Sequence, residues 1–75
     1  MPSIHSIIWF AAPAQPGSQP VLHEQPHQGD FHGALARAIT QSMDPGFLLG
    51  QVLAADGRVM ATVARAGAVK LSPAA

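Results

Sequence analysis

Residues 30–46, DFHGALARAITQSMDPG, are the most strongly patterned stretch of the sequence and predict an amphipathic helix. Asp30 is a favourable N-cap, because its carboxylate accepts hydrogen bonds from the free amides of the first turn. Pro45 cannot continue a helix and Gly46 tolerates the reversal that follows, so we expect the helix to span 31–43. At about 100° per residue, the apolar side chains gather on one side of this helix. That side is formed by Phe31, Ala34, Leu35, Ala38, Ile39 and Met43.

After the helix, residues 47–64 predict two strands joined by a tight turn. Asp56-Gly57 is a favoured pair for the two-residue type I′ turn, in which both residues have positive φ. Such a turn sets the register and leaves one apolar face, which suits a packed helix, and one mixed face. Residues 68–71 can add a short last strand, and residues 72–75 form a tail. The expected facing pairs are Leu53 with Met60, Val52 with Ala61, and Gln51 with Thr62.

Before the helix, residues 3–11 predict a strand that is apolar on both faces. Residues 12–29 contain four Pro and two Gly, which disfavour both a helix and a central strand, so a long loop is expected there. Val21 and Leu22 would either attach this loop to the core or form a short edge strand. A loop of this length in a small domain is usually functional or disordered.

The expected order is β-(long Pro-rich loop)-α-β-β, which predicts a two-layer α+β fold. One helix would pack on a mainly antiparallel sheet of three or four strands. The 75 residues are enough for a single domain, 1–75, with a small core. No Cys is present to supply a disulfide or a thiolate metal site.

The amino-acid composition of the chain argues against some classes of function. Charged residues make up 11% of the chain and hydrophobic residues 48%, and the formal net charge is zero. Nucleic acid is therefore not expected as a partner, because the electrostatic part of its binding grows with the number of phosphates that a protein neutralises. No apolar run approaches the roughly 20 residues of a membrane helix. We expect a cytoplasmic protein, of the cell or of a host cell, without a cofactor.

One helix can cover only one side of a sheet, so the second apolar side predicts self-association as a homodimer or a protein partner. The function expected from this is that of a small non-enzymatic protein-binding module. It would be an inhibitor or adaptor of the kind that phages and mobile elements encode. It would act through apolar surface and the Pro-rich loop. The candidate binding residues are Trp9, Val21, Leu22, Leu53 and Met60.

Histidines in the predicted loop raise a metal-binding alternative. His23 to His27 match the letters of the HExxH zinc motif, which needs a helix to bring both rings to one ion. Pro26 opposes a helix there, so a protease is not expected. A plainer zinc site would use His23, His27 and His32. The competing interpretation, a polar uncharged loop that binds no metal, is favoured because structural zinc sites usually include thiolates.

Pro2 supports an enzymatic alternative, since removal of the first Met would leave a secondary amine able to act as a general base. With an apolar strand and one amphipathic helix, the chain loosely resembles the small tautomerase family over residues 2–8 and 35–44. The resemblance implies an oligomeric enzyme with Pro2 as the catalytic base. Two features depart from that pattern: no Arg precedes Arg37, and the Pro-rich segment has no counterpart.

Overall fold

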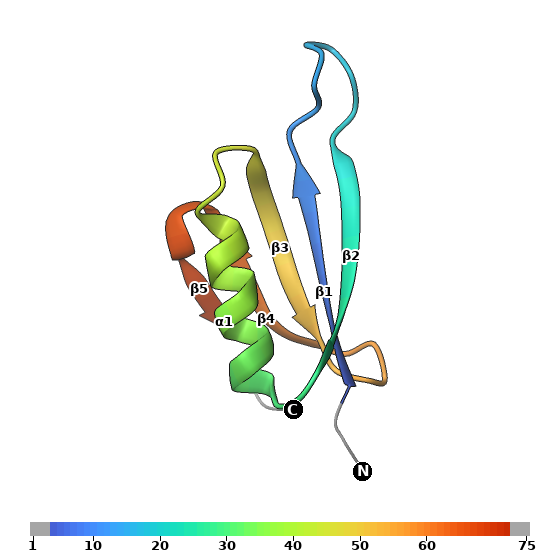
Figure 1. Ribbon diagram of the computed structural model, residues 1–75, viewed down its shortest axis with the longest axis vertical. Helices are drawn as coiled ribbons and strands as arrows, with labels where there is room; N and C mark the ends of the chain where they lie inside the picture. The colour runs from blue at the N-terminus through green and yellow to red at the C-terminus, as the bar shows by residue number, and fades with distance from the viewer. Residues whose placement is uncertain (1–3, 73–75) are drawn as a thin grey trace.

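The computed structural model describes residues 4–72, in which a single helix packs on one face of a five-stranded sheet (Figure 1). All neighbouring strands are antiparallel, in the order β2-β1-β3-β4-β5. The predicted α+β class and the helix-on-sheet layering are thus confirmed, with one strand more than the three or four expected. The elements are β1 (Ile4–Ala11), β2 (Val21–Gln28), α1 (Phe31–Ser42), β3 (Phe47–Leu53), β4 (Val59–Ala64), the 3₁₀ turn η1 (Arg65–Gly67) and β5 (Val69–Leu71).

The helix forms where the sequence predicts it. The Asp30 side chain caps its start by accepting a hydrogen bond from the Gly33 amide at 2.8 Å. It ends at Ser42, one residue before the predicted end, and Met43 serves as the C-cap. Met43 was expected on the buried side, but it is 61% exposed because it lies past the last regular turn. No helix in the described residues is long and apolar enough to cross a membrane.

The predicted loop over 12–29 is wrong in its second half. Residues 21–28 form the edge strand β2, which pairs along its whole length with β1, and only 12–20 connect the two. Pro26 is compatible with this strand because an edge strand has one backbone side without a partner, where a missing N–H loses no ladder bond. The observed order of elements is therefore β-β-α-β-β-β. The β1–β2 hairpin carries the 12–20 connection beyond the end of β3 (Figure 1).

The turn between β3 and β4 also differs from the prediction. The Gly57 amide donates to the carbonyl of Ala54 (2.9 Å), and the Ala54 amide donates to the carbonyl of Arg58 (2.8 Å). Gly57 has φ +88°, but Asp56 does not have a positive φ. A type I′ turn would require a positive φ at both residues. These bonds define a three-residue loop whose Gly adopts the left-handed conformation, the commonest alternative for hairpins.

The longer turn is compensated by a bulge, which restores the predicted register further along. Leu53 faces Val59 instead of Met60, and the register then shifts by one residue. Beyond the shift, the two predicted pairs Val52–Ala61 and Gln51–Thr62 are confirmed. The short last strand predicted over 68–71 is also confirmed, as β5. Of the predicted tail, Ser72 donates its amide to the Met60 carbonyl at 3.1 Å, and residues 73–75 lie outside the described part.

Gly57→Val should destabilise the fold by about 1–2 kcal/mol or more, because a β-branched residue is strained at positive φ. An added Cβ at this position would meet nothing within 4 Å, so the cost arises from the backbone conformation alone. Gly57→Asn is the matched control, since Asn tolerates the left-handed region. Chemical denaturation measures both; equal stability of the Val and Asn variants would contradict this conformation at Gly57.

The core lies between α1 and the sheet. Small residues on the helix allow its backbone to approach β3 closely, and larger side chains from the strands fill the space beneath it. Trp9, Phe31, Leu35 and Ile39 pack around this cluster while remaining partly exposed. The buried apolar residues are Ile7, Ala34, Ala38, Phe47, Val52, Ala61 and Val63.

Candidate functional site

The face of the sheet that points away from α1 is the main candidate surface, and we call it the open face. Cross-strand partners project to the same side of a sheet, and side chains alternate along each strand, so the register assigns its members. The open face carries every second residue of β1 (4–10), β2 (22–28), β3 (49–53) and β4 (60–64), together with Lys70 of β5.

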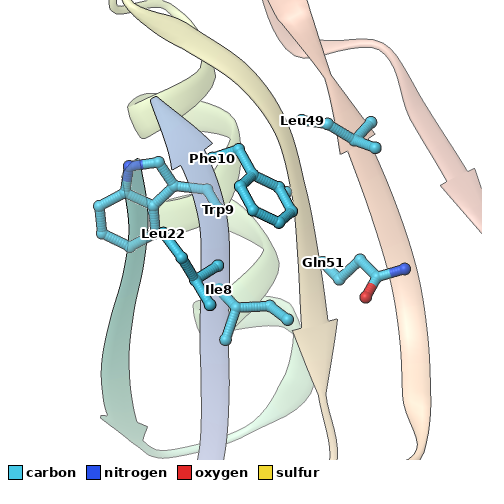
Figure 2. Close-up of a pocket in the computed structure, with 7 residues that line it drawn as sticks. Ile8, Trp9, Phe10, Leu22, Leu49 and Gln51 are labelled. Atoms are coloured by element: carbon cyan, nitrogen blue, oxygen red, sulfur yellow. The ribbon is translucent and has the colours of Figure 1, made fainter. Parts of the chain in front are cut away.

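Large apolar side chains are exposed on the open face. Ile4, Phe10, Leu22 and Leu49 keep between 43% and 55% of their surface accessible. Phe10, Leu22 and Leu49 surround a shallow hollow of about 120 Å³, to which Ile8 and Gln51 also contribute. Figure 2 shows Ile8, Phe10 and Leu22 side by side over β1 and β2, with Leu49 and Gln51 across β3. The hollow is thus an apolar depression bordered by one amide.

A row of five residues runs across the middle of the open face, perpendicular to the strands. Ile8 pairs with Glu24 on one side and with Gln51 on the other, and the row continues through Thr62 to Lys70. Its two ends lie on the two edge strands and carry opposite charges. Four of the five residues in this row are polar, with a carboxylate at the β2 edge and an ammonium at the β5 edge.

The structure separates the five predicted binding residues. Leu22, Leu53 and Met60 belong to the open face. Trp9 and Val21 lie on the side of the sheet that faces α1. Trp9 stacks on the His23 ring with centroids 5.3 Å apart and packs against the core. In Figure 2 its indole lies apart from the Phe10 ring and the Leu49 side chain.

Sequence reasoning missed the strongest members of the open face. On β1 the prediction named Trp9 as the binding residue, whereas Ile8 and Phe10 are the residues of this strand that lie on the open face. The error has a physical origin, because both faces of β1 carry large apolar groups and alternation alone cannot tell which one a helix covers. The pairing of Ile8 with Gln51 resolves the ambiguity, because Gln51 and its partner Thr62 lie on the side of the sheet away from the helix.

The three histidines of the metal-binding alternative do not converge. His23 and His27 lie four residues apart on one face of a strand, about 13 Å at roughly 3.3 Å per residue, which is too far for one ion. The His27 Nδ1 lies 3.2 Å from an Arg37 guanidinium nitrogen, and His32 packs against Phe31. Within residues 4–72, no group of three or more His, Cys, Asp or Glu could hold a metal ion.

A second, more polar region lies beside α1, above β1 and β2. A hollow of about 230 Å³ is bounded by the Trp9–His23 stack, Gln41 and Asp44. Asp44 is already engaged, because its Oδ1 accepts the Gly46 amide at 2.8 Å. Deeper on the same side, His5 is 8% exposed and its Nδ1 has no hydrogen-bond partner among the described residues.

Pro2, the catalytic residue of the tautomerase alternative, lies outside the described residues. Comparison of the chain with protein-family models, with curated protein sequences and with solved structures finds no match.

Proposed function

We propose that the chain is a protein-binding module whose binding surface is the open face of the sheet. The observation that carries this proposal is the exposure of Phe10, Leu22 and Leu49 around one hollow. Contiguous apolar patches beyond a few hundred Å² are rare on the surfaces of monomers and mark interaction sites. An occupant that removes these side chains from water would gain about 25 cal/mol for each Å² of apolar surface buried.

The shape and charge of the open face favour a protein as occupant. The face is broad, its hollow of about 120 Å³ is smaller than the roughly 300–1,000 Å³ of small-molecule sites, and it offers one cation, Lys70, at its edge. A phosphate backbone requires several cations in a row, and a small ligand requires a deeper pocket that encloses most of its surface. An apolar protein surface needs neither a row of cations nor a deep pocket. The module would act as an inhibitor or adaptor, with the exposed 12–20 connection as an additional contact at the end of the β1–β2 hairpin.

Capture from extracts of the source cells tests this proposal. The bait is the tagged chain as wild type, as Phe10→Lys on the open face, and as Ala36→Lys on the exposed side of α1. Both variants add one positive charge, but only Phe10→Lys would bury it in the interface, where an unpaired charge is costly. We expect at least one protein, an untagged copy of the chain included, to be retained by wild type and Ala36→Lys and reduced about tenfold or more for Phe10→Lys.

Circular dichroism of the three baits checks that each is folded. Two results would overturn the proposal: retention that is the same for all three folded baits, or no specifically retained protein with the wild-type bait.

A further inference from the structure

The polar row across the open face has a symmetry that points to its occupant. β3 is the central strand of five, so β1 and β4 are equidistant from it, as are β2 and β5. Glu24 on β2 and Lys70 on β5 therefore lie at equal distances on either side of Gln51. A half-turn about an axis that is parallel to β3 and passes over the Gln51 side chain places each of these two positions above the other.

We propose that the occupant is a second copy of this chain, packed open face to open face about a two-fold axis parallel to β3. Glu24 of each copy then lies opposite Lys70 of the other, which gives two ion pairs at the rim. Gln51 meets Gln51 of the second copy on the axis, where two side-chain amides can donate to each other. This proposal rests on the proposed function, because it names the partner of the same surface.

Charge selects this axis over the other two-fold arrangement in which the strands of the two copies stay aligned. An axis that lies in the interface but runs perpendicular to the strands would place each residue of the row over the same residue of the second copy. Glu24 would then face Glu24, and Lys70 would face Lys70, which is repulsive at both ends. The axis parallel to β3 turns the same four charges into two attractive pairs.

The shapes of the side chains agree with the same axis. The next row across the sheet pairs Phe10 with Leu49 and Leu49 with Ala64. The half-turn brings the bulky Phe10 of one copy over the small Ala64 of the other. Large residues opposite small ones allow two sheets to interdigitate at the usual spacing of about 10 Å. Packed sheets cross at about 30°, which tilts the axis about 15° away from β3 and displaces the row ends by roughly 5 Å, within reach of the long Glu24 and Lys70 side chains.

The area of the open face is comparable with that of a stable dimer interface. Five strands about 4.8 Å apart and up to seven or eight residues long present roughly 500 Å² of flat area, before the relief of the side chains is added. Stable interfaces bury about 800 Å² of accessible surface on each partner. The low charge content of 11% leaves little other protection for an apolar face of this size.

Charge reversal at the ends of the row tests the proposal. Sedimentation and light scattering of the full chain should show a dimer that Glu24→Lys or Lys70→Glu each weakens about tenfold, because both rim pairs become repulsive. The double variant Glu24→Lys/Lys70→Glu should return to within about threefold of wild type. An equal mixture of the two single variants should associate as strongly as the double variant. Arg37→Glu, on the helix side, is the matched control and should leave association unchanged.

Two results would overturn the proposed dimer. One is a wild-type monomer at about 50 μM, well above the dissociation constants of stable dimers. The other is a dimer whose dissociation constant is the same for wild type and Glu24→Lys, as the perpendicular axis would produce. Neither result would by itself refute the proposed function, because a different protein could still be captured by the wild type and lost with Phe10→Lys.

Discussion

Phe47→Ala is expected to reduce the free energy of unfolding by about 3–5 kcal/mol, a large part of the roughly 4–11 kcal/mol typical of a chain of this length. Phe47 is 2% exposed and is the largest fully buried side chain of the described residues. It opens β3, and its ring reaches back over Gly50, so truncation leaves a cavity at the centre of the layer between helix and sheet. The surrounding backbone belongs to paired strands and cannot collapse into that space.

Thermal denaturation at a fixed protein concentration measures this effect, since self-association would make the melting temperature depend on concentration. A fall of roughly 12 °C or more is expected for Phe47→Ala, or no cooperative transition at all. Phe47→Leu is the conservative control and should retain most of the stability because it keeps most of the buried volume. A melting temperature for Phe47→Ala within about 2 °C of wild type would show that this side chain does not fill the core.

Gly50→Val is the second change with a large expected effect, about 3 kcal/mol or more, for the opposite reason of too little space. A Cβ at Gly50 would lie 2.8 Å from the Phe47 ring and 3.1 Å from both the Ile8 carbonyl oxygen and the Trp9 Cβ. The carbonyl belongs to the neighbouring strand and cannot move without breaking the ladder. This differs from Gly57, where the space is open and the backbone conformation is the constraint.

A double-mutant cycle shows whether the ring of Phe47 is the obstacle. Gly50→Ala should be destabilising in the wild-type background and clearly less so in the Phe47→Leu background, with a coupling of about 1 kcal/mol or more. Denaturant unfolding of the four proteins gives this coupling directly. If the two effects on stability are strictly additive, Gly50 is required because β1 approaches it closely and not because of the Phe47 ring.

Local chemistry in the sequence was sufficient for several elements. The Asp30 cap and the stop at Pro45 delimit α1 because both act within one helical turn, so their effect does not depend on distant residues. The pairing of Gln51 with Thr62 also followed from sequence, since a short turn leaves few possible registers. The predicted turn type was nevertheless wrong. The loop has three residues instead of two, and the register shift next to Leu53 restores the predicted pairing beyond it.

Other features depend on contacts between segments far apart in the chain. Residues 21–28 contain Pro26 and few apolar groups, and they form β2 because the exposed backbone edge of β1 provides hydrogen-bond partners for them. Similarly, both faces of β1 are apolar, and only the position of α1 over β3 decides that Ile7 is buried while Phe10 stays exposed.

The sequence by itself therefore determined the helix, two of the three predicted hairpin pairs and the existence of a second apolar face, because these follow from patterns within a few residues. Only the tertiary structure decided which side chains make up that face and which residues align across it. The row from Glu24 to Lys70 draws on all five strands, and its order is set by a strand arrangement that no local pattern encodes. Alignment across a sheet is a product of backbone hydrogen bonding, and all residues other than Pro offer the same backbone groups.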